Sequence, residues 1–197
     1  SKVRCFIFNW EDKGNSSFYW EANGRCRGIS LAKYIFDPEY LLLIDIDEIV
    51  EPEAFYLWLK TEKYKSYKGM KLRNHMYFID PTIRLKGKFY NVVMCRTDYA
   101  LNIPFKEEAR LQYFNNSNKL SRWTAKLGIN PNFYIYKREP FIHHFTGVRT
   151  RENMIKKVTN WGHKNDRTDW IDVINNKFKV EGYRIGEHRF ERVDNIF

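Results

Sequence analysis

An apolar run that ends in a cluster of acids is the feature that most constrains how this chain folds. The bulky residues from Tyr40 to Ile44 are followed directly by Asp45, Asp47 and Glu48. Such a run has the length and composition of a strand that is buried on both faces. Carboxylates are costly to bury, so they belong at the carboxyl end of the strand, where an open α/β sheet binds its ligands. The run therefore predicts an α/β fold with a ligand site at this end.

The spacing of the acids predicts a metal site. Residues two apart on a strand point to the same side, so Asp45 and Asp47 are expected to face one site and Glu48 to face away. Two carboxylates aimed at one point repel each other unless a cation lies between them, and a divalent metal is the usual solution. The alternative is a strand-to-helix junction in which one acid caps the next helix. Acidic caps are common in proteins, but an apolar run that ends in Asp-x-Asp-Glu is uncommon. We therefore favour the metal site.

The charge of the chain predicts a negatively charged partner. The formal net charge is +10, and the basic residues are spread along the sequence, with a local concentration at residues 149–157. Nucleic acid, an anionic membrane surface and phosphorylated small molecules all qualify as partners. No apolar run reaches the roughly 18 residues that a membrane span needs. The three cysteines are scattered, which suits a reducing compartment. We therefore expect a soluble, cytoplasmic protein of one domain.

The pattern along the chain predicts two halves, an α/β half up to about residue 68 and a more antiparallel half after it. Helices are expected at residues 18–36 with an interruption near Asn23-Gly24, at 53–60, at 150–161 and at about 170–178. Strands are expected at residues 3–8, 40–44, 70–73, 75–79, 89–95, 133–136 and 141–145, with turns at Asp80-Pro81 and Lys86-Gly87.

The polar loop after the first expected strand is a candidate for base and ribose binding. It contains Asn9, Trp10 and Asp12. In an open α/β sheet this loop lies over the same crevice as the acidic strand end. Trp10 could stack on a base and Asp12 could accept hydrogen bonds from a ligand. The alternative is a surface loop whose Trp packs on the adjacent helix.

The order of these features resembles the nucleotide-sugar glycosyltransferases of the GT-A fold, and among them family-two-like members with an Asp-x-Asp-Glu metal motif. Three pieces carry the resemblance. They are the segment Gly24 to Val50 that leads through the motif, Ile49 to Pro52 after it, and Ile142 to Glu152 with the helix that follows. The resemblance implies a GT-A-like, Rossmann-like nucleotide-diphospho-sugar transferase fold with a mixed central sheet. It implies one domain over residues 1–197, with about 1–68 binding the nucleotide and about 69–197 binding the acceptor and adding closing helices.

The resemblance also implies an enzyme with a metal cofactor. A sugar would pass from a nucleotide-diphosphate donor, by default a UDP-sugar, to a hydroxyl of a glycan or other acceptor, with Mn²⁺ or Mg²⁺ bound. Asp47 would bind the metal directly, and Asp45 would reach the ribose, or the metal through water. His143 and His144 are neighbours on an expected strand, so one of them faces the crevice as a third ligand. Nucleic acid is not an expected partner, and peripheral contact with a membrane surface stays open.

Basic residues near the motif are expected to bind the diphosphate. The candidates are Arg25, Arg27, Arg149 and Lys156, with Lys157 beside them. Arg149 is expected to be the strongest single contact, because its planar guanidinium can bind two phosphate oxygens at once. The alternative for the lysines is a solvated helix face.

An inverting transferase also needs a carboxylate to deprotonate the acceptor hydroxyl. Glu107 and Glu108 are the paired acids in the middle of the chain, and Asp80 and Asp98 are rivals for the role. Surface glutamate pairs often do no more than bind solvent.

Three alternative functions remain, two of which also use the acidic run. Haloacid-dehalogenase-like phosphatases also open on a strand ending Asp-x-Asp, but their motif usually continues with Thr or Val, where Glu48-Ile49 follows here. Asp-x-Glu exonucleases use a similar strand with a different spacing. A basic nucleic-acid-binding module with exposed aromatic side chains is the non-enzymatic alternative.

Overall fold

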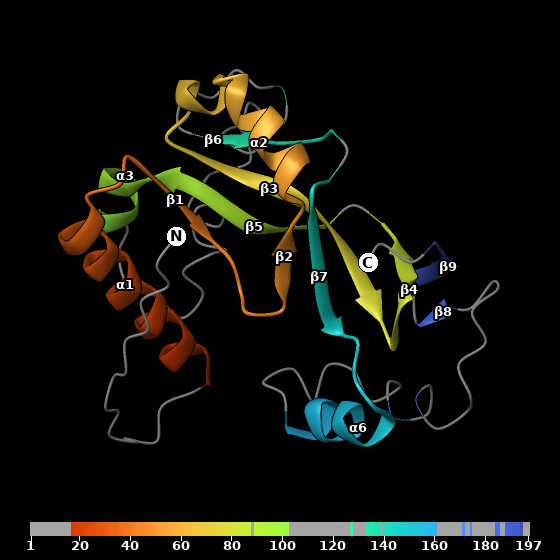
Figure 1. The fold of residues 1–197 in the computed structure, drawn as a ribbon. Helices are drawn as coiled ribbons and strands as arrows, with labels where there is room; N and C mark the ends of the chain where they lie inside the picture. Colours follow the sequence, from red (N-terminus) through yellow and green to blue (C-terminus); the bar gives the residue numbers. More distant parts are fainter. Residues whose placement is uncertain are drawn as a thin grey trace.

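The computed structural model describes residues 17–87, 89–102, 127, 133–138, 140–160, 171, 174, 184–185 and 188–194. Over these residues the chain is an α/β protein with one open, mostly antiparallel sheet of nine strands (Figure 1). The strands are β1 Tyr40–Leu43, β2 Glu48–Val50, β3 Gly69–Phe78, β4 Asp80–Lys86, β5 Phe89–Arg96, β6 Phe133–Ile135, β7 Ile142–Gly147, β8 Arg184–Ile185 and β9 His188–Arg192. The helices are α1 Ser17–Phe36, α2 Pro52–Lys60, the 3-10 helix η1 Lys63–Ser66, α3 Thr97–Leu101 and α6 Arg151–Asn160.

The long strand β3 organises the sheet. Its first half pairs antiparallel with β5, which in turn pairs with β1, and its second half pairs antiparallel with β4. The strands β6 and β7 both run parallel to β3, and β2 pairs antiparallel with β7. The α/β class is therefore as predicted. Antiparallel pairing dominates the described sheet, but the two parallel pairings both lie in the second half, so that half is not the more antiparallel one. The neighbour of β1 among the described strands is the antiparallel β5, which is unusual for a Rossmann-like sheet.

Three clusters of buried apolar side chains hold helices against this sheet. The cluster beneath α1 and α3 includes Ile29, Val93, Cys95, Ala100 and Ile135. The cluster beneath α2 includes Trp58, Met70, Leu72, Val92, Met94, Tyr136, Phe141 and Ile142. The cluster beneath α6 includes Phe78, Ile83, Leu85, Met154, Val158, Ile174 and Phe190. Because α6 is anchored by this third cluster, its N-terminal end is fixed close to the end of β7 (Figure 1).

The apolar run at residues 40–44 forms a strand, but a shorter one than predicted. Strand β1 ends at Leu43, and the side chain of Ile44 is exposed. Leu41 packs on the cluster beneath α1, and Leu42 packs on the cluster beneath α2. Both faces of β1 are thus covered as expected, although its side chains are only partly buried.

The predictions for two helices show how local signals succeed and fail. The expected interruption at Asn23-Gly24 is wrong, because α1 is continuous from Ser17 to Phe36. One glycine costs a helix only about 1 kcal/mol, which the flanking turns offset. The stop at Asp37-Pro38 is confirmed: α1 ends at Phe36, and Asp37 takes a left-handed φ of 44°. Pro52 begins α2, which ends at Lys60 as expected.

The second half contains longer strands than the sequence pattern predicts. The two strands expected at 70–73 and 75–79 are one ten-residue strand, β3. The turn expected at Asp80-Pro81 lies one residue earlier, at Ile79 with φ 68°, because Asp80 already begins β4. The strands β2, β4, β8 and β9 and the helix α3 were not expected.

Several expectations lie outside the described residues. They are the strand at 3–8, the loop residues Asn9, Trp10 and Asp12, the acids Glu107 and Glu108, and most of the helix at 170–178. Within the part of the chain that the structure describes, no helix combines the length and the apolar composition needed to cross a membrane.

Candidate functional site

The acids of the motif lie on a tight connection between β1 and β2, here called the acid turn and defined as residues 45–48. The backbone N–H of Glu48 donates to the carbonyl of Asp45 at 3.0 Å. The backbone N–H of Asp45 donates to the carboxylate of Glu48 at 2.7 Å. The N–H of Phe145 on β7 donates to the carbonyl of Asp47 at 2.8 Å. These hydrogen bonds close the turn and fix it against β7.

Glu48 does not face away from the other acids, and this corrects the sequence prediction. The prediction assumed strand alternation through residue 48, but the strand stops at Leu43 and a turn intervenes. Glu48 begins β2 instead, and only 3% of it is exposed. Its carboxylate therefore belongs to the buried side of the site, whereas Ile46 at the tip of the turn is fully exposed.

His144 lies between two carboxylates of the acid turn. The register of β2 and β7 sets Glu48 directly opposite His144. The Nε2 atom of His144 is 3.4 Å from Oδ1 of Asp47, and its Nδ1 atom is 3.8 Å from Oε1 of Glu48. The Nδ1 atom is buried and has no hydrogen-bond partner among the described residues. The sequence left open which of the two neighbouring histidines faces the acids, and the register of β7 selects His144.

Asp47 is held in its ionised form. Hydrogen bonding to His144 chiefly lowers the pKa of the Asp47 carboxyl, against a smaller opposing effect of burial. The charges of His144 and Lys157 lower this pKa further. A carboxylate with a depressed pKa keeps its negative charge over a wide pH range and is ready to bind a cation.

Two arginines from different elements reach the acid turn. Arg25 on α1 donates to Asp45 in an ion pair of 2.7 Å that is partly buried. Arg149, in the connection between β7 and α6, lies 3.8 Å from the carboxylate of Asp47. Both residues were expected near the acids, and the fold brings them there from distant parts of the sequence.

Lys157 on α6 is the third cation at the turn. Its Nζ atom donates to the carbonyl of Thr146 at 2.9 Å and also to the Thr146 hydroxyl. Burial and the nearby charge of Arg149 lower the pKa of Lys157, while the charges of Asp47 and Asp45 raise it. The ammonium group is thus close enough to interact with both acids of the Asp-x-Asp pair. Figure 1 shows α6 at the end of β7, below the connection between β1 and β2.

Of the other predicted site residues, two basic ones are exposed and two acids have partners of their own. Arg27 and Lys156 are exposed, on α1 and α6 respectively. Asp80 accepts hydrogen bonds from Thr82 at the start of β4, and Asp98 pairs with Arg96 at the start of α3.

Sequence reasoning did not assign Thr146 a role, although a signal was present. On a strand, residues two apart share a face, so Thr146 lies on the same side of β7 as His144. A hydroxyl beside the inward histidine is in position to hold a cation from the next helix, as Thr146 holds Lys157.

His143 points to the opposite face of the sheet and belongs to a second polar cluster. Its Nδ1 atom is 2.9 Å from the hydroxyl of Tyr77, and its Nε2 atom is 3.9 Å from the carboxylate of Glu51. On the same face Arg84 lies 3.4 Å from Nε2 of His75. His143 therefore does not share a site with Asp47, and the sequence expectation of one inward histidine applies to His144.

This second cluster predicts acid sensitivity. Burial, followed by the charges of Arg84, His143 and Arg73, lowers the pKa of His75 to about 4. The unfolded chain therefore takes up the proton at a higher pH than the native chain. This difference stabilises the folded chain at pH values above the pKa of an ordinary histidine. The stabilisation is lost as the pH falls toward the pKa of His75 in the folded chain, by roughly 1–3 kcal/mol. Urea unfolding at pH 7.0 and pH 4.5 should show a smaller difference for His75→Gln than for the parent. An equal difference would contradict this prediction.

Comparison of the chain with protein-family models, curated protein sequences and solved structures finds no match. Among the described residues, no group of three or more His, Cys, Asp and Glu side chains is arranged to hold a metal ion.

Proposed function

We propose that the chain is a metal-dependent glycosyltransferase of the GT-A type that moves a sugar from a UDP-sugar to an acceptor hydroxyl. One observation carries the proposal: the carboxylate of Asp47 and the imidazole of His144 lie together, beside the cations Arg149 and Lys157. The acids suit a divalent cation, and the surrounding positive charge suits the phosphates of a nucleotide diphosphate.

The donor atoms at the acid turn fit a divalent metal. Oδ1 of Asp47 and Nε2 of His144 are 3.4 Å apart, and one ion with bonds of about 2.1 Å can reach both. A proton on the buried Nδ1 of His144 would face Glu48, which leaves Nε2 to bind the metal. Two protein ligands are few for a dedicated metal cage. They are in keeping with a metal such as Mn²⁺ or Mg²⁺ that takes its other ligands from water and the substrate diphosphate.

The proposed chemistry needs negative charge to be stabilised on the leaving group. When the nucleoside diphosphate leaves the anomeric carbon, charge builds up on its phosphate oxygens. A bound divalent cation supplies Lewis-acid stabilisation of that charge. Lys157 and Arg149, which both donate to the carbonyl of Thr146, would bind the same oxygens in the proposed site. Arg25 neutralises Asp45, so the two acids do not both repel the diphosphate.

The GT-A assignment of the fold is part of this proposal. Its support is an α/β architecture in which the acidic motif ends an apolar strand and a histidine-bearing strand packs beside it. The parallel pairing of β3 with β6 and β7 gives the sheet a mixed character.

Thermal unfolding with candidate ligands tests the proposal. UDP with Mn²⁺, at about 100 times its dissociation constant, should stabilise the protein by about 2.7 kcal/mol. For a chain of this size that raises the melting temperature by roughly 5–10 °C. UDP with EDTA should give little shift, and a single-stranded oligonucleotide should give none. A shift produced by the oligonucleotide alone, with steep salt dependence, would instead favour the nucleic-acid-binding alternative.

A further inference from the structure

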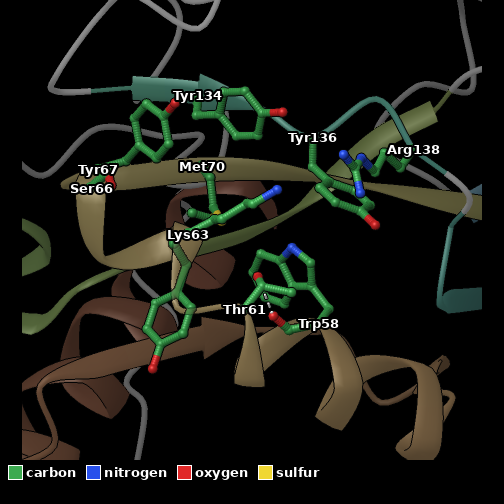
Figure 2. A pocket seen from close by; sticks show the side chains of 10 residues that line it. Trp58, Thr61, Lys63, Ser66, Tyr67, Met70, Tyr134, Tyr136 and Arg138 are labelled. Carbon is green, nitrogen blue, oxygen red and sulfur yellow. Dashed lines mark hydrogen bonds between the residues drawn. The ribbon is translucent and has the colours of Figure 1, made fainter.

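A pocket lined by aromatic rings lies beyond the C-terminal end of α2, away from the acid turn. Its volume is about 200 Å³. Figure 2 shows Trp58, Met70 and Tyr136 around it, with the side chain of Lys63 reaching across. Among the described residues, the lining is Trp58, Thr61, Lys63, Tyr64, Ser66, Tyr67, Met70, Tyr134, Tyr136 and Arg138.

The rings of this pocket are held in place by one another. The ring centroids of Trp58 and Tyr64 are 5.7 Å apart, and those of Trp58 and Tyr136 are 5.6 Å apart. Tyr67 and Tyr134 stack at 4.7 Å with an interplanar angle of 17°. Aromatic contacts of this kind fix side-chain orientation, so the pocket is preformed and a ligand need not order it.

The polar groups of the pocket are hydroxyls and cations. Four of the lining residues are tyrosines, and Thr61 and Ser66 add aliphatic hydroxyls. Burial raises the pKa of the Tyr67 phenol, which therefore stays neutral and can donate as well as accept a hydrogen bond. Lys63 and Arg138 carry positive charge, and the described lining contains no acid.

We propose that this pocket binds a saccharide unit that carries an acidic group, such as a carboxylate, sulfate or phosphate. The C–H bonds of a sugar ring pack well on the electron-rich face of an aromatic ring. Sugar hydroxyls both donate and accept hydrogen bonds, which matches the tyrosine, serine and threonine hydroxyls. Lys63 and Arg138 add charge-assisted hydrogen bonds to the acidic group.

The arrangement of the rings favours a sugar over a nucleobase. A base that is enclosed between two rings needs those rings to be parallel with a gap between them. Tyr67 and Tyr134 are parallel, but at 4.7 Å they stack directly on each other and leave no such gap. The other ring pairs of the lining are inclined, by 69° for Trp58 with Tyr136 and by 43° for Trp58 with Tyr64. Trp58 and Tyr136 are largely buried, so the partly exposed rings of Tyr64, Tyr67 and Tyr134 supply the surface on which a sugar ring would pack, beside their own hydroxyls.

The pocket is separate from the acid turn. The chain runs from the acid turn through β2 and then along the nine residues of α2, about 13 Å of helix, before it reaches Thr61. A ligand in the pocket is therefore not a ligand of Asp47, and the inference does not depend on the proposed transferase activity.

Calorimetry with three probes tests this inference on the full chain. The probes are trigalacturonic acid, a neutral galactose trisaccharide and a thymidine oligonucleotide. Trigalacturonic acid should bind at least about tenfold more tightly than the neutral sugar, because two charged hydrogen bonds are lost with the latter. Lys63→Gln and Arg138→Gln should each weaken that binding about fivefold. Tyr134→Phe, which keeps the ring and removes a hydroxyl, should weaken it about threefold.

Lys65→Gln is the matched control for Lys63→Gln. Lys65 lies on the same 3-10 helix, is exposed and pairs with Glu62 at 2.5 Å, outside the lining of the pocket. Its replacement should leave the affinity unchanged. The inference is overturned if trigalacturonic acid shows no saturable binding, if Lys65→Gln weakens binding as much as Lys63→Gln, or if the oligonucleotide binds more tightly than the acidic sugar.

Discussion

Replacing Asp47 by Asn is expected to weaken Mn²⁺-dependent UDP binding by about 100-fold or more. Asn keeps the size of the side chain but removes the charge that a hard divalent cation requires. The fold should be retained, because Asp47 contributes its backbone carbonyl to the contact with Phe145 and Asn supplies the same carbonyl. Titration calorimetry with UDP, in Mn²⁺ and in EDTA, measures the effect.

Two further variants make the Asp47 experiment specific. Asp98→Asn removes an exposed carboxylate that pairs with Arg96 on another element, and it should bind UDP like the parent. Asp45→Asn should give an intermediate loss, because Asp45 is already neutralised by Arg25 and is not the expected direct ligand. If Asp47→Asn binds UDP with Mn²⁺ as tightly as Asp98→Asn, the proposed metal site is wrong.

The elements that the sequence predicted well are those set by local signals. Pro52 begins α2 where its fixed φ and missing N–H suit the first turn. Asp37-Pro38 stops α1, and the apolar run at residues 40–44 forms a strand because it is rich in bulky side chains. Each of these outcomes depends on residues within a few positions of one another.

The parts that the sequence could not predict depend on pairings between distant segments. Which histidine faces the acids is decided by the register that sets Glu48 opposite His144, about a hundred residues away. Periodicity alone also assumed that the strand continued through Asp47, whereas a turn closed by hydrogen bonds replaces it. The alternation rule was sound, but it was applied where no strand exists.

The aromatic pocket was missed for a similar reason. Residues 60–68 are rich in lysine, and no local pattern marks Tyr64 and Tyr67 as parts of a pocket. The fold stacks Tyr67, which lies just before β3, on Tyr134 of β6, a strand that pairs with β3. Aromatic side chains within a lysine-rich segment therefore indicate a binding surface only once their distant partners are known.

Glu48 is expected to have the largest effect on stability of any residue at the acid turn. Its side chain is fully buried, and its carboxylate accepts the backbone N–H of Asp45 at 2.7 Å. Glu48→Ala would leave that N–H without its acceptor and would remove the negative group beside His144. Loss of a buried acceptor, together with the buried carboxylate that lies beside His144, is expected to lower the free energy of unfolding by about 2–4 kcal/mol. Urea unfolding measures this loss.

Glu48→Gln separates the structural role of this residue from its role toward the metal. The amide oxygen of Gln can still accept the hydrogen bond from Asp45, so the free energy of unfolding should fall by only about 1 kcal/mol. In the proposed site, however, the variant loses the negative charge that would favour a proton on Nδ1 of His144. Removing such a partner of a metal-binding histidine typically costs about 10- to 100-fold in metal affinity. Mn²⁺-dependent UDP binding should therefore weaken by that factor in a variant that remains folded. Unchanged binding by Glu48→Gln, with Glu48→Ala unstable, would mean that Glu48 supports only the turn and does not orient His144.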